Sequence, residues 1–300
     1  MTSATSLVRV ETPGGVRIGV ATADGVHALP VDSMAELLAM PLPRILALVE
    51  NPGDALTVTR LQPPLDGRGE VWCAGVTYAR SMGARMEEST EASVYDKVYA
   101  AERPELFGKA PAWRVVTDGE PVGIRADSGH DVPEPELVLY ANAAGELVGL
   151  GIGNDMSSRS IEGENPVYIP QAKVYAGAMA LAPRITLLTG VGEPTNLAIG
   201  MRIERAGNVV FSGETSTTQL ARRPADLLEW LFRGCEFPDG VALSTGTGIV
   251  PELDFALQEG DVITIEIADL GSLTNTVAVG REPFTALCRG ERPTPAATKN

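Results

Sequence analysis

Three carboxylates and one lysine in the middle of the chain have residue types and a spacing that suit a divalent-metal site. Glu134 and Glu136 lie two positions apart in the run PEPELVLY. Asp155 ends the later run ELVGLGIGND, and Lys173 follows it by eighteen residues. Three hard oxygen ligands suit Mg²⁺, Mn²⁺ or Ca²⁺ rather than zinc. We therefore expect the three carboxylates to bind one cation, with Lys173 as a cationic catalytic partner.

A predicted β-hairpin must bring these carboxylates together. Apolar residues alternate through residues 134–140, which is typical of a half-buried strand. Side chains two positions apart on a strand point the same way, roughly 6.6 Å from each other, so Glu134 and Glu136 can lean onto one cation. Residues 142–145 fit a four-residue hairpin loop, and a return strand over residues 146–153 brings Asp155 back. An isolated Glu-x-Glu is more often a solvated strand face, so the hypothesis depends on the hairpin and Asp155.

The same residues carry a resemblance to a known family. The runs PEPEL, GNDMSSRSIEGENPVYIPQAKVY and LSTGTGIVP resemble the fumarylacetoacetate hydrolase superfamily, most of all its sugar-acid branch, the 2-keto-3-deoxy-pentonate (arabinonate and xylonate) dehydratases. The resemblance extends from about Val71 to Gly280, and the long middle run is its specific part. It implies that Glu134, Glu136 and Asp155 bind Mg²⁺ and that Lys173 faces the substrate.

One segment departs from the hydrolase branch of that family. The branch carries a His and, three residues later, a Glu that together activate water, and the equivalent positions after Tyr78 are Ser81 and Ala84. Neither side chain can act as a general base near neutral pH. The departure argues against carbon–carbon bond hydrolysis. We expect Ser81 and Arg85 to contact substrate hydroxyl and carboxylate groups instead, with an ordinary surface helix as the alternative.

Other polar residues are expected around the substrate. Glu105 lies in RPELF, where the dehydratase branch has an acidic residue that can act through a water; a Glu stabilised at a helix N-terminus is the alternative. Lys109 is expected to line the same cleft. Thr247 and the amides of its Gly-Thr-Gly loop offer donors for a carboxylate. Arg159, within the specific run, is expected to bind the substrate.

The fold expected from pattern is a strand-rich α+β protein, which the resemblance sharpens to the family's mixed β-sandwich roll. Residues 62–70, QPPLDGRGE, are rich in Pro and Gly and are the best linker in the chain. We therefore predict a small N-terminal α/β domain over residues 1–65 and a catalytic domain over residues 66–300. An amphipathic helix near residues 221–232, together with the family's habit, favours a homodimer or a larger homo-oligomer.

Composition restricts the partners and the compartment. A net charge of −15 argues against nucleic acid and against anionic membranes. It does not exclude an anionic substrate, because local Lys, Arg and metal can reverse the field inside a cleft. The three cysteines form neither a metal motif nor a disulfide framework, and the N-terminus has no apolar signal-peptide region. We expect a cytoplasmic enzyme.

The chemistry that these residues favour is enolate formation on a small 2-keto acid. A metal chelated by the carboxylate and keto oxygens makes the neighbouring C3 proton acidic, and Lys173 can transfer that proton. The predicted reaction is Mg²⁺-dependent dehydration of a 2-keto-3-deoxy pentonate to 2,5-dioxopentanoate. Open alternatives are an acylpyruvate- or fumarylacetoacetate-type hydrolase and an oxaloacetate decarboxylase or tautomerase on the same metal. A Schiff-base lyase using Lys173 and an inactive metal-stabilised scaffold also remain open.

Overall fold

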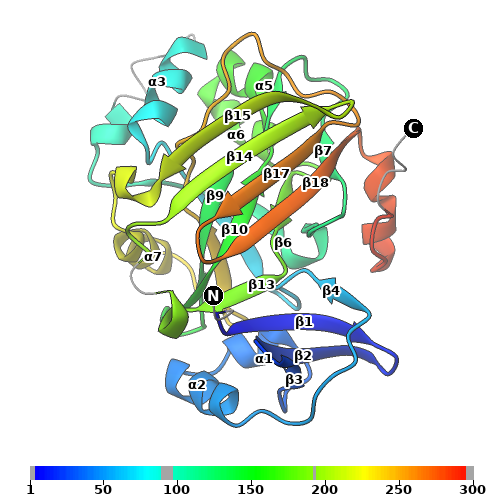
Figure 1. The fold of residues 1–300 in the computed structure, drawn as a ribbon. Coiled ribbons are helices and arrows are strands. Elements are labelled where there is room, and N and C mark those ends of the chain that lie inside the picture. The colour runs from blue at the N-terminus through cyan, green and yellow to red at the C-terminus, as the bar shows by residue number, and fades with distance from the viewer. Residues whose placement is uncertain (1–3, 89–96, 192–193, 295–300) are drawn as a thin grey trace.

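Two large β-sheets form most of the protein, for which a computed structural model describes residues 4–88, 97–191 and 194–294 (Figure 1). The first is an 11-stranded sheet with the order β3-β2-β1-β13-β10-β9-β16-β5-β6, where β12 also pairs with β10 and β4 with β1. Its strands are β1 (Ser6–Thr12), β2 (Gly15–Thr22), β3 (Gly25–Ala28), β4 (Arg60–Gln62), β5 (Glu70–Gly75), β6 (Glu105–Pro111), β9 (Pro135–Ala141), β10 (Leu147–Asp155), β12 (Met179–Leu181), β13 (Arg184–Leu187) and β16 (Val241–Ser244).

The second sheet has five strands and stacks in front of β9 and β10 in Figure 1. Its order is β15 (Asn208–Ser216), β14 (Ala198–Arg205), β17 (Val262–Ile267), β18 (Gly271–Val279) and β7 (Val122–Ile124). A short pair, β8 (Asp131–Val132) with β11 (Ser157–Ser158), lies at the end of the central hairpin. The described α-helices are α1 (Met34–Leu38), α2 (Leu42–Glu50), α3 (Ala79–Glu88), α5 (Arg159–Glu164), α6 (Ile169–Lys173) and α7 (Pro224–Phe232). Short 3₁₀ helices are η1 (Ala112–Arg114), η2 (Pro166–Tyr168), η3 (Leu188–Gly190), η4 (Thr217–Gln219) and η5 (Glu282–Arg289).

The predicted hairpin is present as β9 and β10, which pair antiparallel, but its environment differs from the expectation. All seven residues of β9 are buried, so the prediction of a half-buried strand is wrong. Leu137 and Leu139 pack into a core shared with the second sheet. Val138 and Tyr140 pack on the other face into a core shared with α1. A strand in the middle of a sheet that is covered on both sides has no solvent face, whatever its alternation.

The N-terminal segment shares the main sheet. Strand β1 pairs with β13, and Leu7 and Ile18 pack in the same core cluster as Tyr140. The predicted division into domains at residues 65 and 66 stays a prediction, and the sheet and this core both continue across it. In the part of the chain that the structure describes, no helix is long and apolar enough to span a bilayer.

Helix α7 shows where the apolar face of the predicted helix at residues 221–232 packs. Its buried residues Leu227, Leu228 and Leu231 belong to the core between the two sheets. This face of α7 is therefore buried in the core of the protein, so it is not available for contacts between subunits.

Candidate active site

The central hairpin gathers the three predicted ligands at one end of the two central strands β9 and β10. Glu134 directly precedes β9, Glu136 pairs with Gly153 of β10, and Asp155 is the last residue of β10. The backbone N–H of Asp155 donates to the carbonyl oxygen of Glu134 at 3.0 Å, which fixes the end of the hairpin. Each carboxylate is at most 3% exposed, and each offers an oxygen within 4.8 Å of the others. The structure therefore brings these three residues together.

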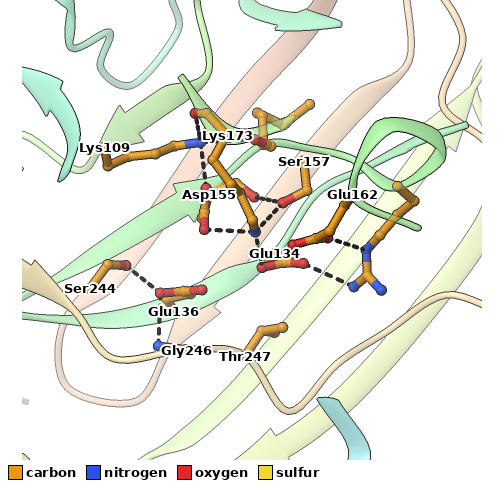
Figure 2. Close-up of polar contacts among 12 residues, drawn as sticks. Lys109, Glu134, Glu136, Asp155, Ser157, Glu162, Lys173, Ser244, Gly246 and Thr247 are labelled. Atoms are coloured by element: carbon orange, nitrogen blue, oxygen red, sulfur yellow. Dashed lines mark hydrogen bonds and ion pairs between the residues drawn. The ribbon is translucent and has the colours of Figure 1, made fainter. Parts of the chain in front are cut away.

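Lys173, the last residue of α6, extends between two of these carboxylates (Figure 2). Its Nζ donates to Glu134 Oε2 at 2.7 Å and to Asp155 Oδ2 at 2.9 Å. A third donor bonds Ser157 Oγ at 2.5 Å. The side chain is fully buried. Pro170 in the first turn suits the start of this short helix, because the missing N–H of proline would have no intrahelical partner there.

Two further buried cations stand beside the carboxylates. Lys109 Nζ lies 2.5 Å from Asp155 Oδ1. Arg159 Nη2 donates to Glu134 Oε1 at 2.9 Å, and its Nε lies 3.9 Å from Glu162 Oε2. Both oxygens of Glu134 are thus held by cations. The described contacts of Arg159 orient a predicted ligand, whereas sequence reasoning assigned Arg159 to the substrate.

Glu136 is held by neutral donors from a segment that is distant in sequence, at the end of the neighbouring strand β16. Ser244 Oγ, at the end of β16, donates to Glu136 Oε2 at 2.5 Å, and the backbone N–H of Gly246 donates to the same oxygen at 2.8 Å. Burial, and then the charges of Asp155 and Glu134, raise the pKa of Glu136 to about 8. Gly246 has φ +91°, and a Cβ there would lie 2.0 Å from Thr77 Oγ1, so only glycine suits this loop.

These observations fit a divalent cation. The donors are hard carboxylate oxygens, which Mg²⁺ and Mn²⁺ prefer. A bound cation would favour the ionised form of Glu136, against the burial and the neighbouring charges of Asp155 and Glu134 that raise its pKa. Cys73 lies close enough for Asp155 and Glu136 to raise the pKa of its thiol, but burial contributes most, and a neutral buried thiol is a poor ligand.

The remaining predicted residues lie at different places around this cluster. Glu105 begins β6 and pairs with Gly75, so it is a strand residue and the alternative of a helix N-terminal Glu is wrong. Its carboxylate covers Gly75, where a Cβ would lie 2.0 Å from Glu105 Oε2. Ser81 is buried in α3 at 4% exposure. Arg85 belongs to α3, but its side chain lies outside the described residues. Thr247 Oγ1 accepts from the backbone N–H of Ile249 at 3.2 Å, which braces the loop.

Sequence reasoning missed several polar residues of the site. Ser157 and Ser244 bond Lys173 and Glu136. Both lie in runs that carry the family resemblance, but no role was predicted for either. Glu162 is 1% exposed beside Arg159, and its only signal was its spacing of three residues on a short helix. Lys109 was expected in the cleft, but nothing in its strand pointed to Asp155.

Comparisons with known proteins show which family the chain belongs to. The family model described as "Fumarylacetoacetate (FAA) hydrolase C-terminal" matches residues 70–278. The chain belongs to the fumarylacetoacetate hydrolase family. The resemblance read from the three sequence runs is thereby confirmed. The match includes every predicted site residue but not the N-terminal strands β1 to β4.

Two relatives within the family are dehydratases by name. A "Probable 2-keto-3-deoxyxylonate dehydratase" of Haloferax volcanii is 44% identical over 224 residues, which are 75% of this chain and 77% of that protein. A "2-dehydro-3-deoxy-D-arabinonate dehydratase" of Saccharolobus solfataricus is 37% identical over 227 residues, 74% of this chain and 76% of that protein.

A solved structure in the family has the same fold. The structure described as "2-keto-3-deoxy-D-arabinonate dehydratase complexed with magnesium and 2,5-dioxopentanoate" aligns with a TM-score of 0.80 at 32% identity. The alignment covers 92% of this chain and 100% of that chain. The prediction of a strand-rich α+β fold of the fumarylacetoacetate hydrolase type is confirmed.

Proposed function

We propose that this protein is a Mg²⁺-dependent dehydratase that converts a 2-keto-3-deoxy pentonate to 2,5-dioxopentanoate and water. One observation carries the proposal: a buried Glu134, Glu136 and Asp155 cluster is joined by Lys173 in a chain 44% identical to a named dehydratase. A relative of known structure holds magnesium and 2,5-dioxopentanoate, which supports the same substrate class and metal.

The carboxylates would hold the metal, and the buried cations would keep them in place. Bound there, Mg²⁺ supplies Lewis-acid polarisation of the keto group. Lys173 contacts two of the three ligands, so its ammonium lies beside the place where a metal-bound keto acid would sit. Its role is to move the C3 proton. Departure of the C4 hydroxyl as water leaves a C3=C4 double bond. Transfer of a proton from C5 to C3 then gives the C4=C5 enol, and tautomerisation of this enol, with its hydroxyl proton moving to C4, leaves the C5 aldehyde.

Glu105, Ser81, Arg85, Arg159 and Thr247 stay proposed site residues with different support. Glu105 faces Gly75 at the end of β5, where α3 begins a few residues later, and it could hand a proton to the departing hydroxyl through a water. Ser81 is buried on α3 and could bond a substrate hydroxyl. For Arg159, the contact with Glu134 favours a ligand-orienting role over direct binding of the substrate. The loop of Thr247 and Gly246 acts on Glu136 through the Gly246 amide.

The experiment that tests the function is a substrate panel. The protein is incubated with 2-keto-3-deoxy pentonates, an acylpyruvate and oxaloacetate, with Mg²⁺ or with EDTA, and products are identified by NMR. We expect 2,5-dioxopentanoate from at least one pentonate, only with metal. Cleavage of the acylpyruvate, or turnover of oxaloacetate alone, would replace the proposal with one of the other family activities. A borohydride-trapped adduct on Lys173 would indicate a Schiff-base lyase.

Two further proposals concern the state of the enzyme. We propose a homodimer or larger assembly that acts in the cytoplasm on this small keto acid. The support for assembly is the edge strand β15, where Val209 is 56% exposed and Val210 is 40% exposed. The support for the compartment is that all three cysteines are free, which fits a reducing environment.

A further inference from the structure

Lys109 is a buried lysine whose contacts join the end of β10, which carries the predicted metal ligand Asp155, to the end of α6, which carries Lys173. Its side chain comes from β6 and is 1% exposed. The ammonium donates to the carbonyl oxygen of Met156 at 2.9 Å and to the carbonyl oxygen of Lys173 at 2.5 Å. Its third contact is the ion pair with Asp155 Oδ1 at 2.5 Å (Figure 2).

Two of the three N–H donors of this ammonium bond these backbone carbonyls, and the Asp155 carboxylate lies against the same group as an ion pair. The Nζ atom also lies 5.8 Å from the centre of the Tyr175 ring. Lys109 therefore differs from Lys173, whose described Nζ partners are side chains at the ligand cluster.

The two oxygens of Asp155 consequently have separate partners. Lys109 faces Oδ1, while Oδ2 bonds Lys173, which also bonds Glu134. Met156 follows Asp155 directly in the chain, so Lys109 contacts both the Asp155 carboxylate and the backbone carbonyl of the next residue. Its bond to the carbonyl of Lys173 ties the last turn of α6 to the same point. A cation is also well placed there, because it opposes the negative end of the helix.

We propose that Lys109 is a positioning residue of the proposed metal centre: it holds the carboxylate of Asp155 in one orientation and sets the distance between that ligand and Lys173. The inference rests on the proposed metal site but not on any particular reaction. An outer partner of a metal ligand typically contributes ten- to a hundredfold to metal affinity. Loss of the Lys109 ammonium should weaken metal binding by about that factor, because Asp155 is then free to rotate.

Direct metal binding tests this without turnover. Mn²⁺ binding to wild type, Lys109→Met and Lys109→Arg is measured from the electron paramagnetic resonance signal of free Mn²⁺. Lys97→Met is the matched control, because it makes the same chemical change at an exposed lysine. We expect Lys109→Met to bind Mn²⁺ at least about tenfold more weakly, Lys97→Met to bind as wild type, and Lys109→Arg, which keeps the charge, to recover part of the loss.

Mn²⁺ affinity of folded Lys109→Met within twofold of wild type would overturn the inference, even if its melting temperature fell, because a merely structural lysine changes stability alone. If Lys109→Met does not fold, Mn²⁺ binding by Lys109→Arg decides. An affinity more than twofold weaker than wild type supports the inference, and an affinity within twofold of wild type overturns it. Failure of the dehydratase proposal is separate, since it shows as absent product while Mn²⁺ still binds in a Lys109-dependent way.

Discussion

Replacing Lys173 with methionine removes the ammonium that joins the ligand cluster and keeps much of the side-chain volume. In the wild type this ammonium contacts Glu134 Oε2 at 2.7 Å, Asp155 Oδ2 at 2.9 Å and Ser157 Oγ at 2.5 Å. A thioether can neither donate to these oxygens nor move a proton. The substitution therefore tests two roles of Lys173: transfer of the substrate proton, and compensation of the negative charges of Glu134 and Asp155.

The structure sets two magnitudes for this variant. Breaking a buried ion pair by removing one partner costs about 3–5 kcal/mol, so metal-free Lys173→Met should be less stable than wild type by that order. Mg²⁺ should return part of this stability, because a cation that binds only the folded protein stabilises it. Loss of the proton-transfer group should lower the rate by a factor on the order of 10² to 10⁴.

Exchange of the C3 protons of a 2-keto acid with D₂O isolates the proton-transfer step. Wild type should exchange them only with Mg²⁺, and Lys173→Met should exchange them at the reduced rate while still binding Mg²⁺ in a calorimetric titration. Lys97→Met controls for loss of a lysine as such. Normal exchange by Lys173→Met would refute the assignment and move the base elsewhere, with Glu105 acting through water as the first candidate.

Three other outcomes are expected. Glu105→Gln should lower the rate of dehydration by a factor on the order of 10² and leave metal binding unchanged. Gly75→Ala should also lower the rate, because its Cβ would lie 2.0 Å from Glu105 Oε2. Full activity in both variants would remove Glu105 from the mechanism. Burial raises the pKa of Asp131 from its ordinary 3.8 to about 6, so the folded protein holds this proton more tightly and stability should fall as pH rises through that window. The decline in the free energy of unfolding should be about 1–2 kcal/mol after solvent screening, and Asp131→Asn should lack it. The same dependence of melting temperature on pH in wild type and Asp131→Asn would contradict this prediction. Sedimentation should show a species larger than 31.6 kDa at micromolar concentration, and a 31.6 kDa species would contradict assembly.

The ligand cluster was predictable because its signals are local. Two glutamates two positions apart at the start of a strand, a tight turn and a return strand fix the relative places of Glu134, Glu136 and Asp155 within one hairpin. Lys173 lies on a short helix soon after that hairpin, within the same specific run of sequence. The types and spacing of these residues therefore predicted the metal site, and the three sequence runs that contain and follow them predicted the family by resemblance.

The partners of those residues depended on the tertiary structure. Ser244 reaches Glu136 across 108 residues of chain because β16 pairs antiparallel with β9. Lys109 reaches Asp155 from the edge strand β6, which pairs only with β5 among the described strands. The burial of both faces of β9 likewise depends on what covers the sheet. A period-two pattern records which side chains share a face, but not which distant strand becomes the neighbour or what packs above it, since those choices come from the packing of the whole chain.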